Sequence, residues 1–271
     1  AATGGQARRD TFHVRSRRWR ATSGAMPHRA FSLEEVATYL HLNVPDVEEL
    51  VKYHEIPFVM RGGRAVFQRG EIDAWASQRI LGLPENRLAI YHQKTLRGTR
   101  EIFADGALIP ELLSVENIEA ELPAKTKNSV IREMVALAEK TGRVFDTATL
   151  LASVEEREAL CSTALPGGVA LLHSRHHQSY EFEGSFMVLG RTVQKVPYGA
   201  PDGYPTRLFF LICCDDDRLH LHTLARLCLM AQKTDILEKL YTLPDRTSMY
   251  EALLYSEQTV LLGKKPEPPV A

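Results

Sequence analysis

The sequence predicts two units: a small helical domain with a hairpin over residues 31–81, and an α/β fold, a mixed sheet flanked by helices, over residues 108–263. Two observations indicate the α/β class. Strand-like apolar runs alternate with amphipathic helical segments after residue 108, without internal repeats. In addition, four apolar residues from Val169 to Leu172 follow two glycines, a pattern typical of a buried strand.

Composition is that of an ordinary globular protein. The chain has 271 residues, of which 44% are hydrophobic and 25% are charged. It contains no run of about 18 apolar residues, so no membrane span is expected and a cytoplasmic location is predicted. The four cysteines lack metal-site spacing, which favours free, mostly buried thiols in a reducing compartment.

The charge is distributed unevenly along the chain. Residues 1–30 contain seven arginines and one acid, a net charge of +6, whereas the whole chain carries −1. Such an arm can touch nucleic acid. It lacks the apolar segment of a secretory signal. Alternatively, it is sequence translated from an early start, because Met26 precedes the first structured segment. We expect a disordered, functionally minor tail at 1–30 and a short tail at 264–271.

The N-terminal unit carries clear signals for helix starts and turns. Ser32 with Glu35 three residues later forms a capping box, and Gly62-Gly63 interrupts an alternating segment as a hairpin turn does. Three helices and one hairpin are expected, in chain order at 32–42, 45–54, 57–67 for the hairpin, and 71–79. This pattern resembles the excisionase/MerR-type winged helix-turn-helix.

The winged helix-turn-helix resemblance implies DNA binding, with Arg61 and Arg64 of the hairpin as candidate phosphate contacts. The net charge argues against DNA binding, because residues 31–83 hold five basic and eight acidic side chains. The second helix, the expected recognition helix, carries three acids: Asp46, Glu48 and Glu49. Acids there repel phosphates. Two interpretations therefore stay open, DNA binding and a helix-turn-helix retained for protein docking.

A connector is expected at 82–107, with a short helix at 87–95 and a loop from Arg97. Beyond it, Ser129 is predicted to cap a helix that ends at Lys140, and Asp146 or Thr147 to begin the next. The remaining elements are predicted from apolar periodicity as an edge strand at 118–122, strands at 169–173, 181–193 and 207–214, and helices at 219–231, 235–242 and 248–257.

Three motifs occur in order in this second unit: Arg157-Glu158 followed by Ser162-Thr163, then Gly168-Val-Ala-Leu-Leu-His173, then His220-Leu-His-Thr-Leu-Ala. Together they resemble the IIA phosphocarrier domain of the fructose/mannitol/nitrogen-regulatory class of the bacterial phosphotransferase system. Leu172 stands where that family usually has proline. Leucine leaves the backbone angle φ less restricted than proline does and adds an N–H donor. The resemblance implies that His173 is phosphorylated by an HPr-like phosphohistidine carrier protein, with Arg157 and His220 supporting it and no cofactor.

The residue types suit that chemistry. Imidazole, with a pKa of about 6.5, is a neutral nucleophile near pH 7, and a backbone carbonyl at the strand end can fix its tautomer. The phosphoryl group passes through a state with negative charge on its oxygens. Arg157 offers a planar fork of donors, His220 lies near a helix N-terminus, and the hydroxyls of Ser162 and Thr163 are candidate phosphate ligands.

Several alternatives remain. His222 follows His220 by two residues, about 200° around a helix, so both cannot face one site. His176 and His177 are expected in a solvated loop, although together with the other three histidines they could hold zinc. At the level of function, the chain is predicted to be a regulator whose phosphorylation alters its engagement of a target protein or DNA. The alternatives are a non-phosphorylated docking module and a sugar-specific transport component, so an enzyme activity is expected only if phosphorylation occurs.

Overall fold

The computed structural model describes residues 30–100, 106–174 and 182–262. The predicted tails, and the loop that contains His176 and His177, fall outside these ranges, apart from Ala30. Among the helices described, none combines the length and the apolar content that a membrane crossing requires.

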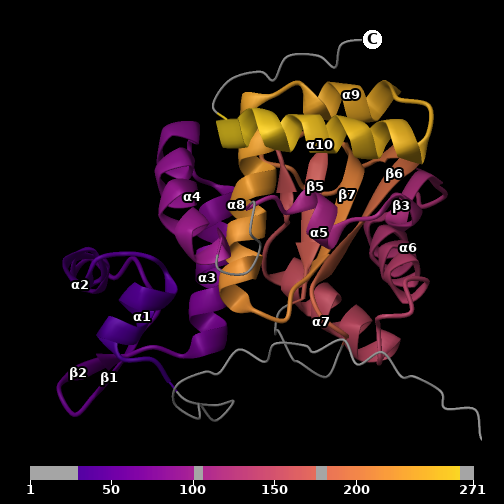
Figure 1. Ribbon diagram of the computed structural model, residues 1–271. Helices are drawn as coiled ribbons and strands as arrows, with labels where there is room; N and C mark the ends of the chain where they lie inside the picture. The colour runs from indigo at the N-terminus through magenta and orange to yellow at the C-terminus, as the bar shows by residue number, and fades with distance from the viewer. Residues whose placement is uncertain (1–29, 101–105, 175–181, 263–271) are drawn as a thin grey trace, which may run out of the picture.

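The N-terminal unit has the elements that its caps and turns predicted (Figure 1). In chain order they are α1 (Leu33–Tyr39), α2 (Val44–Lys52), β1 (Val59–Arg61), β2 (Arg64–Val66) and α3 (Arg69–Leu81). The capping box is present, because Glu35 N donates to Ser32 Oγ at 3.2 Å and Ser32 N donates to Glu35 Oε2 at 2.8 Å. Gly62 and Gly63 have φ values of +56° and +76°, as the tight antiparallel β1–β2 turn requires.

The connector is more helical than predicted. Helix α4 spans Glu85–Arg100, so the helix expected at 87–95 is longer at both ends and the loop expected from Arg97 is wrong as far as Arg100. The physical reason is tertiary. Helix α4 packs along α8 (Asp217–Lys233), and such packing overrides the weak local preference against helix at Gly98.

The second unit is built on a mixed sheet, as predicted, and this sheet has five strands. In spatial order the strands are β3 (Ile118–Leu122), β6 (Phe186–Val196), β7 (Thr206–Cys213), β5 (Val169–His173) and β4 (Ala164–Leu165). Strand β3 is an edge strand parallel to β6, β6 and β7 are antiparallel, and β5 is parallel to β7. The two-residue strand β4, which pairs antiparallel with β5, was not predicted.

Helices surround this sheet. Besides α8 they are α5 (Ile109–Leu112), the 3₁₀ helix η1 (Val115–Asn117), α6 (Lys127–Glu139), α7 (Thr147–Leu160), α9 (Ile236–Thr242) and α10 (Arg246–Leu262). The prediction that Ser129 caps α6 is wrong. Thr126 has the extended backbone of an N-cap and accepts from Ser129 N at 3.2 Å, while Ser129 Oγ accepts from Thr126 N at 2.9 Å. Asp146 caps α7, as one of the two predicted options.

The alternation of side chains along β5 divides the apolar interior into two cores. Val169 and Leu171 join the core that contains residues of α8, α9 and α10 and of the N-terminal unit. Ala170 and Leu172 join the core formed with α6 and α7. Because strand side chains alternate, His173 shares the α8 side with Val169 and Leu171. Leu172, the departure from the family pattern, packs on the opposite side and is 1% exposed.

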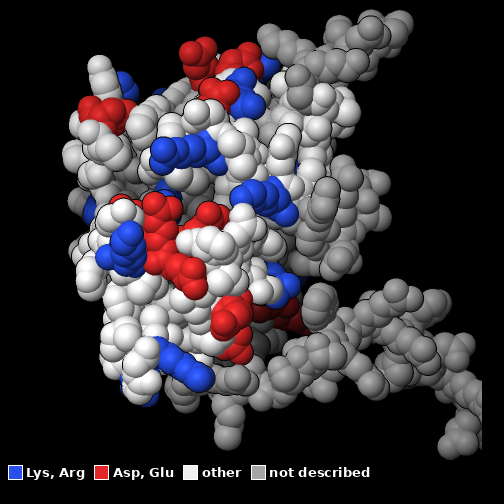
Figure 2. All heavy atoms as spheres, turned by 90° about the vertical axis from the view of Figure 1, so that its left-hand side faces the viewer, with Lys and Arg blue, Asp and Glu red and all other residues white. Residues whose placement is uncertain are grey.

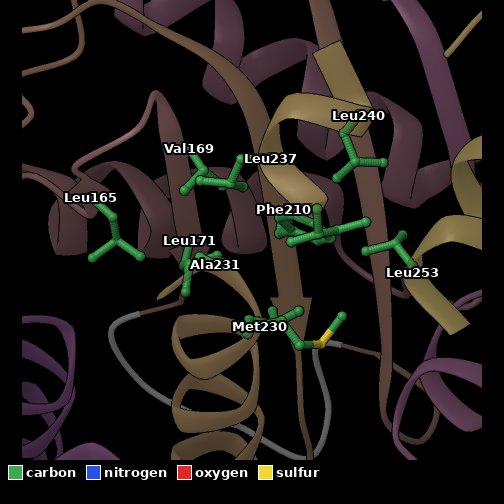
Figure 3. A pocket seen from close by; sticks show the side chains of 11 residues that line it. Leu165, Val169, Leu171, Phe210, Met230, Ala231, Leu237, Leu240 and Leu253 are labelled. Carbon is green, nitrogen blue, oxygen red and sulfur yellow. The ribbon is translucent and has the colours of Figure 1, made fainter. Parts of the chain in front are cut away.

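A small cavity lies next to this strand (Figure 3). It encloses about 10 Å³. Its lining is apolar throughout: Leu165, Val169, Leu171, Phe210, Leu227, Met230, Ala231, Ile236, Leu237, Leu240 and Leu253. A void of this size without polar partners does not hold an ordered water, so it belongs to the packed core.

All four cysteines are free, and three of them are buried: Cys213, Cys214 and Cys228. Burial raises the pKa of the Cys214 thiol and raises that of Cys228 to about 12. Both thiols therefore stay protonated, which agrees with the expectation of buried, unreactive cysteines.

Candidate active site

His173 is the last residue of β5, and its ring is held by two hydrogen bonds. Nδ1 lies 2.9 Å from the carbonyl oxygen of Leu171, and the Nε–H of Arg157 donates to Nε2 at 2.9 Å. A carbonyl oxygen only accepts and a guanidinium only donates. The ring therefore carries its proton on Nδ1 and presents the Nε2 lone pair to Arg157. The side chain is almost wholly buried, at 1% exposed.

Arg157 stands in the last turn of α7 and is 2% exposed. Its Nη1 donates to the carbonyl oxygen of Cys161 at 3.2 Å and contacts the Cys161 sulfur at 3.4 Å. Its Nη2 is buried and has no hydrogen-bond partner in the described part of the chain. A buried donor without a partner is costly, so this nitrogen is available for an incoming acceptor next to Nε2 of His173.

His220 lies in the first turns of α8, beside His173. The two ring centroids are 4.8 Å apart with a tilt of 53°, and His220 is fully buried. Helix α8 begins at Asp217 after the N-cap Asp216, whose carboxylate accepts from Leu219 N at 2.8 Å. The second imidazole therefore sits near the positive end of a helix of 17 residues. The fold thus brings together the three side chains predicted to act as one site.

The two predicted phosphate ligands with hydroxyl groups are engaged elsewhere. Ser162 Oγ donates to the carbonyl oxygen of Tyr198 at 2.8 Å, and Thr163 Oγ1 donates to Glu158 Oε2 at 2.6 Å. Glu158 is buried, and its Oε1 pairs with Lys127 Nζ at 2.8 Å. In this arrangement neither hydroxyl proton is directed to the imidazoles, so their role as phosphate ligands stays a prediction.

Ser77 is a contact of the site that motif reasoning missed. It lies on α3 of the N-terminal unit, is fully buried, and places Oγ 3.4 Å from Nε2 of His220. Nothing in the local sequence marks it, because the two residues are 143 positions apart and meet only through packing of α3 on α8.

His222 faces away from the site, as the helical spacing predicted. Its ring stacks on that of His92 in α4, with centroids 4.8 Å apart, and its Nδ1 lies 2.5 Å from Thr95 Oγ1. A zinc cluster that uses both His220 and His222 is therefore not assembled in the part of the chain described here. Among those residues, no cluster of three or more histidine, cysteine or carboxylate side chains is arranged to hold a metal.

His222 belongs to a buried polar network that joins α4, α8 and α10. Arg226 donates from Nε to His92 Nε2 at 2.6 Å and pairs through Nη1 with Glu257 at 2.5 Å. Glu257 also accepts the backbone N–H groups of Leu108 and Ile109. Burial lowers the pKa of His92 to about 3, with the positive charges of Arg226 and Lys233 as smaller causes, and burial also lowers the pKa of His222. Both histidines are therefore neutral near pH 7.

The predicted DNA contacts, Arg61 and Arg64, face each other across the β1–β2 turn and are exposed. The three acids of α2 are exposed as well: Asp46, Glu48 and Glu49. Figure 2 shows the face on that side of the molecule, where lysine and arginine are interspersed with aspartate and glutamate rather than gathered in one basic surface.

Comparison with known proteins follows the same division of the chain. Residues 111–256 match the family described as "Phosphoenolpyruvate-dependent sugar phosphotransferase system, EIIA 2", and residues 30–80 match a helix-turn-helix domain. A "PTS system fructose-specific EIIABC component" of Bacillus subtilis is 29% identical over 134 residues, which cover 49% of this chain and 21% of that protein. The chain thus spans about a fifth of that relative.

Two other matches cover nearly all of the similar protein. A "PTS system fructose-specific EIIA component" of Haloferax volcanii is 26% identical over 147 residues, 54% of this chain and 94% of that protein. The crystal structure of "Nitrogen Regulatory Protein IIA-Ntr" from Neisseria meningitidis superposes with a TM-score of 0.50 at 28% identity, covering 54% of this chain and 99% of that one. Similarity in sequence and in structure thus covers about half of this chain.

Proposed function

Because the chain belongs to the EIIA 2 family of the phosphoenolpyruvate-dependent sugar phosphotransferase system, we propose that His173 accepts a phosphoryl group from a phosphohistidine carrier protein. The observation that carries the proposal is the hydrogen-bond geometry of the His173 ring. Leu171 holds Nδ1–H, so the lone pair that can attack phosphorus is on Nε2, next to the guanidinium of Arg157.

The transfer exchanges one N–P bond for another. Nε2 of His173 attacks the phosphorus atom, the N–P bond of the carrier's phosphohistidine breaks, and its electron pair returns to the carrier's imidazole. Arg157 then turns its Nε–H from Nε2 to a phosphoryl oxygen, and Nη2 donates to another. Fixed donors aimed at the developing charge are an effective source of catalysis. The ring of His220, with its centroid 4.8 Å from that of His173, is the second imidazole next to the reacting nitrogen.

The fused helix-turn-helix favours regulation over sugar transport as the purpose of this phosphorylation. In this proposal the phosphorylation state of His173 is read by the N-terminal unit and alters its engagement of DNA or of a target protein. The alternative is a docking module that keeps the IIA fold without accepting phosphate. These two functions differ in whether His173 is ever labelled.

Labelling tests the proposal directly. The full chain is incubated with phosphoenolpyruvate and the two general phosphotransferase proteins, and phosphohistidine is located by mass spectrometry under alkaline conditions. We expect label on wild type and on His54→Gln, a control at an exposed histidine, and none on His173→Ala. An unlabelled wild type would contradict the proposal and favour the docking module.

DNA binding is a second candidate function, supported by the helix-turn-helix match and by the exposed pair Arg61 and Arg64 on the hairpin. The test is binding of a mixed-sequence 30-base-pair duplex at several salt concentrations. Affinity for DNA falls with salt, and if both arginines contact phosphates, the variant Arg61→Gln/Arg64→Gln makes the plot of log affinity against log salt concentration less steep by about 2. An unchanged slope would leave protein docking as the role of this unit.

A further inference from the structure

The site described above is closed by another part of the same chain. His173 is 1% exposed and His220 is fully buried. A carrier protein must bring its phosphorus atom into contact with Nε2, which such burial does not permit. The α3–α8 contact covers the His220 side of this site, because Ser77 Oγ reaches His220 Nε2 at 3.4 Å.

The contact between α3 and α8 has a polar part, which lies beside apolar residues of α3 that belong to the shared core. Arg69, Asp73 and Ser77 are spaced four residues apart and so share one face of α3. Arg69 pairs with Asp217 at the start of α8, through an Nε–Oδ2 hydrogen bond of 2.8 Å, and the Arg69 side chain is 49% exposed. Asp217 is 8% exposed, so water reaches this ion pair from the arginine side, which limits what the pair contributes.

The next helix is held far more firmly. Helix α4 is fixed to α8 by the buried network of His92, His222 and Arg226. Between α3 and α4 lie only the three residues 82–84, which include one glycine and one proline. This short segment is the point at which the N-terminal unit can turn while α4 stays in place.

On the basis of the proposed function, we infer that α3 and the phosphohistidine carrier compete for one surface, the face of α8 around His220. In the closed chain α3 occupies this surface and the carrier is excluded. Phosphorylation occurs from an open state in which residues 31–81 have moved away about the 82–84 segment. The transfer rate is therefore reduced by the fraction of open chains.

Phosphorylation then keeps the chain open. A phosphoryl group on Nε2 displaces the Arg157 hydrogen bond and adds about two negative charges beside an interface that already holds the carboxylates of Asp73 and Asp217. The phosphorylated chain consequently exposes the α3 face, and the unphosphorylated chain covers it. The partner of α8 is a segment of this chain in one state and a carrier protein in the other.

Chemical modification tests the closure without relying on phosphoryl transfer. Diethyl pyrocarbonate modifies accessible imidazoles, and peptide mass spectrometry gives the rate at each histidine. In the wild-type chain, His173 should react at least ten times more slowly than the exposed His54. Arg69→Ala, which removes the ion pair to α8, should raise the His173 rate about threefold.

The matched control is Arg79→Ala. Arg79 is an exposed arginine of the same helix that packs on Trp75. It should leave the His173 rate unchanged. Circular dichroism should show that all three proteins are folded. A wild-type His173 that reacts as fast as His54, or equal His173 rates in Arg69→Ala and Arg79→Ala, would overturn the inference.

Two further measurements separate this inference from the proposed function. Single-turnover transfer from the phosphorylated carrier should be about threefold faster in Arg69→Ala than in wild type. Hydrogen exchange at α3 amides should accelerate about tenfold on phosphorylation, with α4 unchanged. If no variant is labelled, the proposed function fails and the modification rates still decide the closure. If all are labelled at one rate and α3 exchange does not change, the competition is wrong.

Discussion

The single proton on His173 is positioned by backbone geometry and by one arginine. Since Leu171 accepts from Nδ1–H, a backbone carbonyl orients the nucleophile, and Arg157 faces the reactive nitrogen. Lysine keeps the charge at position 157 but lacks the planar fork that serves Nε2 and the phosphoryl oxygens together.

We therefore expect Arg157→Lys to lower the rate of phosphoryl transfer to His173 by about 100-fold, the usual loss when an aligned donor is removed. Single-turnover labelling with the carrier protein measures the rate. Arg132→Lys, at an exposed arginine of α6, is the control and should transfer at the wild-type rate. A rate for Arg157→Lys within twofold of wild type would show that the fork is dispensable.

At the scale of the element, helix caps decide where the supporting helices begin. Helix α6 packs on β6, and its first turn is fixed by the reciprocal bonds of Thr126 and Ser129. Thr126→Ala removes the hydroxyl that accepts from Ser129 N and should lower the free energy of unfolding by about 1 kcal/mol.

Urea denaturation monitored by circular dichroism measures this loss. Thr126→Ser keeps the hydroxyl and serves as the matched control, with an expected change of a few tenths of a kcal/mol at most. Equal stability of the alanine and serine variants would mean that Ser129, as the sequence pattern predicted, is the residue that matters.

Local signals explain which elements could be predicted. The capping box of Ser32, the glycine pair of the hairpin and the apolar strand before His173 are properties of short segments, and each was found where predicted. The family match at residues 111–256 confirms the phosphotransferase resemblance, and the match at residues 30–80 confirms a helix-turn-helix domain. Helix α4 extends further than its own residues indicate, and β4 is too short to leave a pattern. Both depend on packing against distant elements.

The residues of the candidate site also fall into two groups, those predicted from local motifs and those placed by packing of distant elements. His173, Arg157 and His220 were predicted from three separated motifs, and the fold brings them together. Ser77 was not predicted, because its role comes from the packing of one unit on another rather than from spacing along the chain. The hydrogen bonds from the Ser162 and Thr163 hydroxyls to Tyr198 and Glu158 were not predicted from the sequence either.

At the scale of the whole molecule, the buried network between α4 and α8 should make stability depend on pH. The folded-state pKa of His92 is about 3, below the unfolded value of about 6.5, so its contribution is present above pH 6.5 and is lost as the pH falls toward 3. The pKa of His222 is also lowered, so His222 makes the dependence of stability on pH steeper.

For His92 alone, linkage predicts a loss of about 2 kcal/mol of unfolding free energy between pH 7 and pH 5. His92→Gln keeps an acceptor for the Nε–H of Arg226 but does not titrate, so its stability should fall by about 2 kcal/mol less than that of wild type over this range. Urea unfolding at the two pH values measures the difference. His54→Gln, at an exposed histidine, should show the wild-type dependence, and parallel curves for His92→Gln and wild type would exclude this assignment.

The opposite directions of His220 and His222 restrict how the molecule can change shape. Both rings are attached to one rigid helical rod, one against His173 and the other against His92. A twist of that rod about its long axis that withdrew one ring would disturb the other ring's stacking by the same angle. Helix α8 is therefore fixed in its angular setting, and a motion that uncovers the phosphoryl site has to be made by its neighbour α3.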